Sequence, residues 1–497
     1  MRFEYLPVPK WPTLAWLCRC DRHSSTVAVA HGLGVETNPD WFCEAAWAGD
    51  YERGDFDRTD IVAGTGGRRR DGSVVFVSSG STVDRLQTLE TDKTVWISNS
   101  LSALLAGVDA DLDPSFPKYF RHFRTVVKGI RQYTRLLSTS AGPIQLVYFD
   151  NLVWDGRSLR VQAKPGLGRD FSGFAKFRGF LQDSMQAMAA NLAHPRRGRP
   201  LAWLSTASSG YDSSTATVLG HQAGCRDVLC VDHGKTGSDD SGEPLAHELG
   251  MSVVKVKRFA WRDEPWPEVP FLSADAHGGD VFFKGAEPVL AGRVLLTGFH
   301  GDKMWDKHPS DLSDNIVRGD QSGLSLTEYR LTAGFLHCAV PFWGVRQIRE
   351  VNAISQSAEM TPWDVPGDYS RPICRRIVEE AGVPREMFGT EKKATWVQFI
   401  RSDEFLSRAS CDSYLEWLKA NQGAWLRHGR VPPLRNVRFD LWELAGRRVF
   451  NMDPKHIRRR SLLVRVRGAI AERPTRLRRY VFPWAVERRK ECYSQPF

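Results

Sequence analysis

One stretch of the sequence combines the residue types that bind phosphate. Residues 201–224 read LAWLSTASSGYDSSTATVLGHQAG, an apolar run that breaks into small hydroxyl and glycine residues before helix-like spacing resumes. Small residues let a backbone approach phosphate closely, and the hydroxyls of Ser208, Ser213 and Ser214 add donors. Asp212 repels a bare phosphate, so the stretch predicts a phosphate site that includes a cation. The alternative is a serine-rich turn between a strand and a helix.

The elements expected around this loop place it at a sheet edge where ligands bind. Apolar runs and helical spacing alternate, predicting strands at 201–205, 228–232 and 252–257 and helices at about 212–223 and 241–249. This alternation predicts a parallel sheet with flanking helices, to which residues 293–298 add another strand. Ligands of such sheets collect at the carboxyl ends of the strands, where the next helix presents unpaired N–H groups.

The remaining sequence indicates further units on either side of this sheet. The first 165 residues carry short β-like runs separated by turn signals, with helical spacing after residue 100, and predict a mostly β or α+β domain. A linker is expected at 162–170 and a helix at 171–193, and the pattern from about 325 to 420 is mainly helical. We therefore expect domains at 1–165 and 166–420, followed by a basic extension at 421–497.

The positive charge of the chain is concentrated in this extension. The net charge is +10, but residues 421–497 alone hold 19 Lys and Arg against 6 Asp and Glu. Arginine interleaved with apolar residues could contact RNA, a membrane surface or an acidic partner, or form a solvated helix face whose apolar side is packed. The nine cysteines show no metal-binding spacing and no run of 18 apolar residues occurs, so we expect reduced thiols and a cytoplasmic location.

The loop resembles a known ATP-binding motif. Walker and G-x-G-x-x-G patterns are absent, but residues 208–213, SSGYDS, resemble the S-G-G-x-D-S loop of the N-type ATP pyrophosphatases, with Ser209 at a usual glycine position. That family includes asparagine synthetase, β-lactam synthetase and tRNA-modifying enzymes, which adenylate a substrate with ATP and release pyrophosphate. The resemblance implies ATP and Mg²⁺ as cofactors. It places the following residues at the phosphates: Ser208, Ser209, Gly210, Tyr211, Asp212, Ser213 and Ser214.

A second segment resembles the asparagine-synthetase branch. Residues 294–308, VLLTGFHGDKMWDKH, are similar to L-S/T-G-x-G-x-D-E-L-F, which implies that Gly298 lies at the nucleotide and that Asp302 joins Asp212 as a magnesium ligand. Phe299 stands where the family carries an acid or a tyrosine and cannot accept a proton. His300 is a candidate base for the amine step, and the alternative is a structural histidine.

Two more segments follow in the family's order. Residues 232–256 resemble the strand whose end lies over adenine, which adds Asp232 to the expected nucleotide contacts. Residues 369–396 resemble the late K-x-x-L-R…L-P-x-x-I-x-x-R-x-K segment, which makes Lys392 the candidate that stabilises the reacting phosphate, with Lys393 as second choice. An exposed turn is the alternative for this lysine pair.

The first domain resembles a glutaminase that lacks its nucleophile. Residues 71–107 are similar to the glutaminase half of these proteins, which begins with an N-terminal cysteine. Here residue 2 is Arg2, and Cys18 and Cys20 are internal, so we expect no glutaminase activity. The expected fold is an α/β chain with an adenine-nucleotide-alpha-hydrolase-like parallel sheet and flanking helices, preceded by an α+β glutaminase-like domain.

The resemblance implies a ligase that forms amide bonds. A small-molecule or peptide carboxylate would be adenylated by ATP, AMP and pyrophosphate would be released, and an amine would take the acyl group. Two alternatives remain open: a tRNA-modifying enzyme that holds RNA with the basic extension, or a non-catalytic asparagine-synthetase-like regulator. The second is motivated by the departures from the family pattern at Ser209, Phe299 and Lys303 and by the missing N-terminal cysteine.

Overall fold

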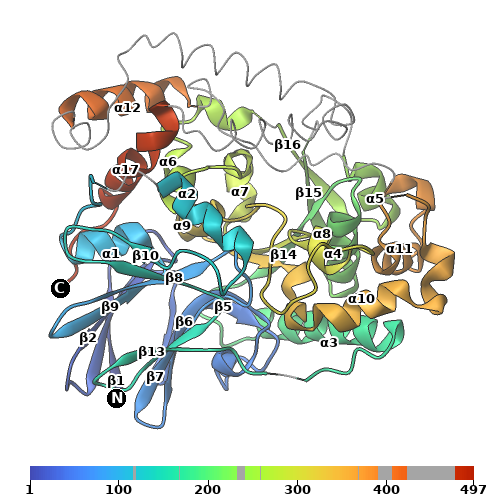
Figure 1. The fold of residues 1–497 in the computed structure, drawn as a ribbon, viewed down its shortest axis with the longest axis horizontal. Helices are drawn as coiled ribbons and strands as arrows, with labels where there is room; N and C mark the ends of the chain where they lie inside the picture. The colour runs from blue at the N-terminus through green and yellow to red at the C-terminus, as the bar shows by residue number, and fades with distance from the viewer. Residues whose placement is uncertain are drawn as a thin grey trace.

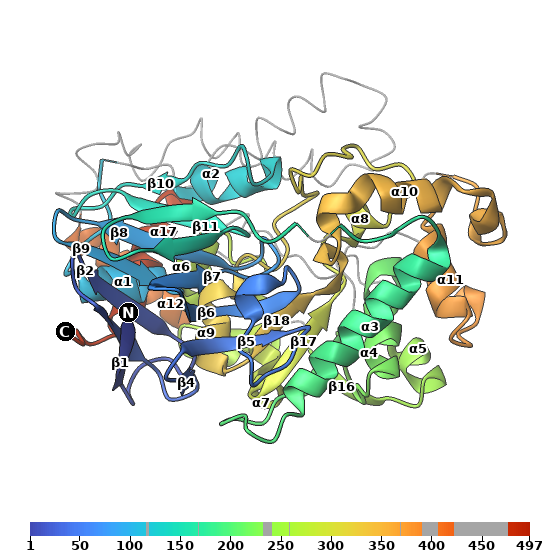
Figure 2. The same ribbon diagram turned by 90° about the horizontal axis from the view of Figure 1, so that it is seen from below.

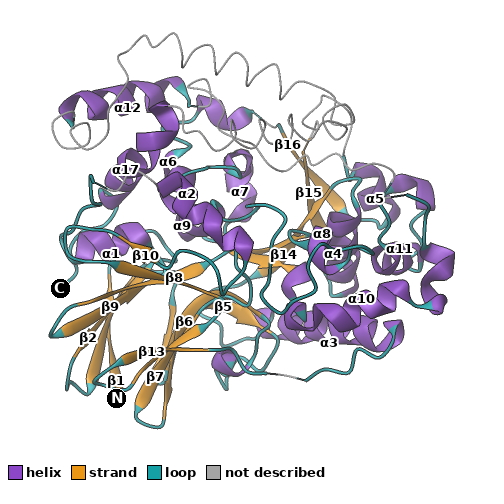
Figure 3. Ribbon diagram, in the orientation of Figure 1, coloured by secondary structure: helices purple, strands orange, loops and turns teal. Residues whose placement is uncertain are grey.

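The chain combines antiparallel sheets in its first third with a parallel α/β sheet in its remainder (Figures 1 and 3). This computed structural model describes residues 1–115, 119–166, 168–231, 241–257, 259–367, 369–389, 406–421 and 476–497. Asp232, Lys392, Lys393 and most of the basic extension lie outside the described residues. The expected general α/β class with a parallel sheet is confirmed.

The first antiparallel sheet lies at the N-terminus, and its strands are ordered β1-β3-β2-β9-β8-β11-β10. They are β1 (Arg2–Pro7), β2 (Trp16–Asp21), β3 (Thr26–His31), β8 (Arg85–Glu90), β9 (Thr94–Ser98), β10 (Leu136–Leu137) and β11 (Ile144–Tyr148). The pair β1 and β3 runs parallel, whereas the other pairs are antiparallel. The helix expected after residue 100 is α1 (Leu101–Gly107), which Ser100 caps by accepting from the Ala103 N–H.

The second antiparallel sheet has the order β13-β12-β7-β6-β5-β4. Its strands are β4 (Glu36–Asn38), β5 (Trp41–Trp47), β6 (Val62–Arg70), β7 (Ser73–Val77), β12 (Asn151–Trp154) and β13 (Leu159–Gln162). One core cluster joins residues of both sheets, among them Trp16 and Ile97 of the first and Phe42 and Trp154 of the second. Alternating apolar residues on facing strands thus fill one layer between the sheets.

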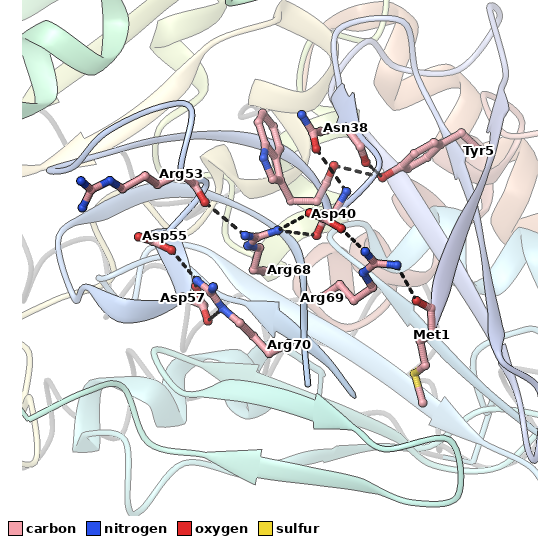
Figure 4. Close-up of polar contacts among 11 residues, drawn as sticks. Met1, Tyr5, Asn38, Asp40, Arg53, Asp55, Asp57, Arg68, Arg69 and Arg70 are labelled. Carbon is pink, nitrogen blue, oxygen red and sulfur yellow. Dashed lines mark hydrogen bonds and ion pairs between the residues drawn. The ribbon is translucent and has the colours of Figure 1, made fainter. Parts of the chain in front are cut away.

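An arginine run at the end of β6 is neutralised by neighbouring acids (Figure 4). Arg70 pairs with Asp55 at 2.6 Å and with Asp57 at 2.7 Å. Arg69 pairs with Asp40 and donates to the Met1 carbonyl oxygen at 3.0 Å. Through the Arg69 bond, Met1 is held against the second sheet.

The parallel sheet contains, among the residues described, five strands in the order β16-β15-β14-β17-β18, all parallel. They are β14 (Ala202–Ala207), β15 (Asp227–Val231), β16 (Ser252–Val256), β17 (Arg293–Thr297) and β18 (Leu336–Ala339). The first four match the expected strands. Strand β18 lies in the segment expected to be helical, because a four-residue strand has too few positions to distinguish the two periods.

Helices pack on both the parallel sheet and its neighbours. Within the described residues, the α-helices after α1 are α2 (Tyr119–Arg124), α3 (Phe174–Leu192), α4 (Tyr211–Gln222), α5 (Glu243–Glu248), α6 (Val269–Asp275), α7 (Glu287–Leu290), α8 (Gly301–Met304), α9 (Leu326–Ala333), α10 (Ile348–Gln356), α11 (Pro372–Glu379), α12 (Arg408–Ala420) and α17 (Arg476–Lys490). Helix α4 packs on β14 and β17 and contacts α3 and α11, whereas α9 packs on β18 and α6. Figure 2 shows α3, α4, α5 and α11 together on the side away from the antiparallel sheets. No helix in the described ranges is both long and apolar enough to span a membrane.

A fully buried ion-pair network joins the two parts of the chain. Arg330 of α9 pairs with Glu44 of β5 and with Asp84, at 2.5 and 2.8 Å, and its side chain has no exposed surface. Strand β18 also lies against β5 and β6. Burial of a charge is costly unless it is paired, so this network specifies how the parts meet.

The C-terminal helix α17 is packed by its apolar side. It contacts α1, α2 and α6, and the side chains of Val481, Phe482 and Trp484 are buried. Arg489 and Tyr493 reach Glu328 at 3.2 and 2.7 Å. In this described portion, the basic extension forms part of the core.

Candidate functional site

The serine-rich loop lies where the expected sheet edge places it. Strand β14 ends at Ala207 and α4 begins at Tyr211, so residues 208–210 connect a central strand to its helix. The Ser208 hydroxyl oxygen lies 2.7 Å from that of Ser213, and it accepts from the Gly210 N–H at 3.2 Å. These bonds curl the loop around the N-terminal end of α4, where the helix dipole favours an anion.

Two of the predicted loop residues face protein. Ser214 is fully buried and donates to the carbonyl oxygens of Gly210 and Ser208, at 2.7 and 3.2 Å. Tyr211 is also fully buried, and its hydroxyl oxygen accepts from Arg375. Their side chains stabilise the loop, while Ser209, Asp212 and Ser213 are partly exposed.

The end of β17 packs directly onto the start of α4. A β-carbon at Gly298 would lie 2.3 Å from the carbonyl carbon of Asp212, and one at Gly301 would lie 2.3 Å from its Cγ. The close atoms at Gly298 belong to the backbone and cannot give way, so this position requires glycine, whereas a side chain at Gly301 would displace the Asp212 carboxylate. The two predicted motif segments, 208–213 and 298–302, therefore meet in the structure.

Asp302 follows Gly301 at the start of α8 and is partly exposed. Its carboxylate lies against Gly319, where a β-carbon would be 2.3 Å from Oδ2, and no described residue forms an ion pair with it. Carboxylates and hydroxyls are the hard oxygen ligands that Mg²⁺ takes, usually with few protein ligands and several waters. The donor set fits magnesium phosphate, although the described residues hold no group of three or more His, Cys, Asp or Glu able to bind a metal.

His300 is a buried neutral ring. It is 6 % exposed, stacks on Phe342 with ring centroids 4.5 Å apart, and makes no hydrogen bond with a described residue through either ring nitrogen. Burial, with Arg318 nearby, lowers the pKa of His300 to about 3. A ring that holds a proton so weakly is a poor acceptor from an amine, so this environment weighs against His300 as a base.

Arg371 forms an ion pair with the aspartate of the loop. Its Nη1 contacts Asp212 Oδ1, its Nε lies 3.7 Å from Asp306 Oδ2, and its side chain is 2 % exposed. Burial alone would lower the pKa of Arg371, but Asp212 and Tyr369 raise it above its ordinary value. Sequence reasoning missed this residue, although three arginines within six residues, at 371, 375 and 376, were a visible signal.

The segment around α11 closes over the same loop. Tyr369 lies with its ring centroid 4.9 Å from that of Tyr211, and the Gly389 N–H donates to the Ser209 carbonyl oxygen at 2.7 Å. A β-carbon at Gly389 would lie 2.2 Å from the Tyr211 ring. The described chain thus reaches the loop just before Lys392 in the sequence, while Lys392 itself lies outside the described residues.

The thiols in the two antiparallel sheets are unsuited to nucleophilic catalysis. Cys18 and Cys20 of β2 are fully buried, as is Cys43 of β5. Burial raises the pKa of all three thiols above their ordinary value. Since the thiolate is the reactive form, these cysteines are structural.

No protein-family model matches the chain, and no curated protein matches it either.

Proposed function

We propose that the protein is an ATP-dependent ligase that adenylates a carboxylate and transfers the acyl group to an amine. The observation that carries this proposal is the meeting of three separate segments at one end of the parallel sheet: the 208–213 loop, the Gly298–Asp302 turn and the flanks of α11. All three were singled out from the sequence by resemblance to one enzyme family. Their contact is what a shared nucleotide site requires.

The proposed fold assignment follows from the same reasoning. The parallel sheet would be an adenine-nucleotide-alpha-hydrolase-like domain, and the antiparallel part a degenerate glutaminase-like domain. The buried thiols at Cys18 and Cys20 support the loss of glutamine hydrolysis. The amine nitrogen would then come from the substrate itself, from free ammonia or from a carrier.

Each part of the site has a proposed task. The loop backbone and the Ser208 and Ser213 hydroxyls would hold the pyrophosphate part of ATP at the start of α4. Asp212 and Asp302 would hold Mg²⁺, which supplies charge neutralisation at the phosphates when bound. Lys392 would stabilise the charge that develops on the reacting phosphate.

The proposed reaction balances in two steps. A carboxylate oxygen attacks the α-phosphorus of ATP, and the bond to pyrophosphate breaks. The amine nitrogen then attacks the acyl carbon, the bond from this carbon to the AMP oxygen breaks, AMP leaves with the bonding electrons, and the proton from the nitrogen passes to solvent. The protein contributes orientation and preorganised charge.

Phosphorus NMR of the protein with ATP, Mg²⁺, hydroxylamine and a panel of carboxylates tests the proposal. Formation of AMP, pyrophosphate and a hydroxamate is the expected result. Release of ADP would contradict it. So would an unchanged spectrum across the panel, combined with an Asp212→Ala variant that binds ATP as the wild type does.

One observation favours a second candidate, a non-catalytic nucleotide sensor. The ion pair between Arg371 and Asp212 places a cation of the protein itself on the acid that a catalytic site would offer to magnesium. A sensor would bind ATP without releasing AMP, so the same NMR experiment separates the two candidates.

A further inference from the structure

Arg371 is a buried cation held against the phosphate loop. It is the N-cap residue of α11, and its side chain lies between two acids from different elements, Asp212 of α4 and Asp306 after α8. The arginine is 2 % exposed, whereas these acids are 22 % and 19 % exposed. Solvent therefore reaches the acids, with the guanidinium behind them.

The guanidinium has donors that these acids do not use. Arginine carries five N–H donors in a planar fork, which matches phosphate oxygens as well as carboxylates. The Nε of Arg371 is buried and makes no hydrogen bond with a described residue. Asp306 lies 3.7 Å from this Nε, which is an ion pair but too long for a hydrogen bond, so the N–H can still donate to another acceptor.

We propose that Arg371 is a pyrophosphate-binding residue: it pairs with Asp212 in this structure and donates to a phosphate oxygen when a magnesium-bound polyphosphate binds at the loop. The inference rests on the proposed function, because the polyphosphate is the part of ATP assigned to this loop. Arg371 gives up one anionic partner and gains another, so its buried charge stays paired throughout.

The opposite interpretation gives Arg371 only the role of a counter-ion that blocks Asp212. The two interpretations predict opposite changes in magnesium-pyrophosphate affinity when Arg371 is replaced. Removing a blocking arginine frees the carboxylate for magnesium, and binding of magnesium pyrophosphate becomes tighter. Removing a phosphate ligand makes binding weaker.

Titration calorimetry with inorganic pyrophosphate and Mg²⁺ measures whether the affinity falls or rises. Arg371→Gln is expected to weaken binding about 10- to 100-fold, the range for a hydrogen bond between charged groups. Arg371→Lys keeps the charge with fewer donors and should fall between Arg371→Gln and the wild type. The matched control is Arg376→Gln on the same helix, where the arginine pairs with Glu359 and Glu380, and it should bind as the wild type does.

Asp212→Asn removes the carboxylate that pairs with Arg371 and keeps the arginine in place. Without its acid, Arg371 should bind pyrophosphate more tightly than in the wild type when Mg²⁺ is omitted. The role of Arg371 would be overturned if folded Arg371→Gln bound magnesium pyrophosphate as tightly as the wild type or more tightly. It would also be overturned if Asp212→Asn gained no pyrophosphate affinity without Mg²⁺. Neither result would contradict the proposed function. A wild-type protein that binds no pyrophosphate with Mg²⁺ would contradict the proposed function as well.

Discussion

Gly298 packs against the backbone of Asp212 so closely that a β-carbon would lie 2.3 Å from the Asp212 carbonyl carbon. Strand β17 and helix α4 can therefore meet only if position 298 lacks a side chain. This contact sets the position of the loop aspartate relative to Gly301 and Asp302.

Gly298→Ala is expected to lower the free energy of unfolding by at least about 1–3 kcal/mol, because backbone atoms must move to accept the methyl group. Magnesium pyrophosphate binding should also be lost, since the first turn of α4 shifts. Urea denaturation and calorimetry measure the two effects.

Gly179→Ala is the control for this substitution. Nothing lies within 4 Å of a β-carbon at Gly179 in the middle of α3, so alanine there should stabilise the protein by about 0.5–1 kcal/mol. A Gly298→Ala variant that behaves like Gly179→Ala would show that the contact is not tight.

Tyr211→Phe separates loop stability from ligand binding. Arg375 loses the hydroxyl that accepts its Nη2 hydrogen bond but keeps Glu379 at 3.2 Å, so we expect a loss of about 1–3 kcal/mol in stability. Pyrophosphate affinity should change little, because this side chain faces protein. Lost affinity with unchanged stability would instead place the hydroxyl at the ligand.

The buried network of Arg330 predicts a large stability effect far from the loop. Arg330→Met leaves Glu44 and Asp84 without their cation, and removing one partner of a buried pair costs about 3–5 kcal/mol. Urea denaturation measures this loss. The control is Arg131→Ala, whose exposed pair with Asp314 should contribute little. Equal midpoints for the two variants would exclude a structural role for the network.

Asp275 predicts a pH dependence of stability. Burial raises the pKa of Asp275 to about 7, against backbone N–H donors at His277 and Gly278, 2.8 and 3.0 Å away. The folded protein therefore holds a proton that the unfolded chain has already released above about pH 4. Stability from this group is present below about pH 4 and is lost as pH rises towards 7.

Asp275→Asn removes this contribution, because an amide keeps the acceptor oxygen and cannot ionise. Relative to the wild type, the variant should gain stability progressively between pH 4 and pH 7, as measured by urea denaturation at several pH values. Exposed Asp92→Asn is the control. A difference between Asp275→Asn and the wild type that does not change with pH would refute the assignment.

Much of the fold around the loop could be predicted because each element carries its own periodic pattern. The alternation from 201 to 257 predicted β14, α4, β15, α5 and β16 in order, and the apolar run at 293–298 predicted β17. Strand β18 was missed because four buried residues fit either period. Pairing of the N-terminal strands, such as β1 with β3, depends on long-range contacts that no local pattern encodes.

Part of the site could be predicted because two of its segments directly follow predicted strands. Asp212 and the 298–302 turn follow strands that proved adjacent, so strand ends alone brought them together. Arg371 could not be deduced, because its contact with Asp212 depends on where α11 packs across α4. Burial could not be predicted from residue type: Tyr211 and Ser214 were expected at the nucleotide and His300 as a base, yet all three side chains are buried.

The central claim is that the 208–213 loop holds the pyrophosphate part of ATP. A crystal structure with α,β-methylene-ATP and Mg²⁺ tests it most directly. The account predicts the β- and γ-phosphates at the loop and the start of α4, with Asp212 released from Arg371. A nucleotide bound elsewhere, with the Arg371–Asp212 ion pair intact, would contradict it.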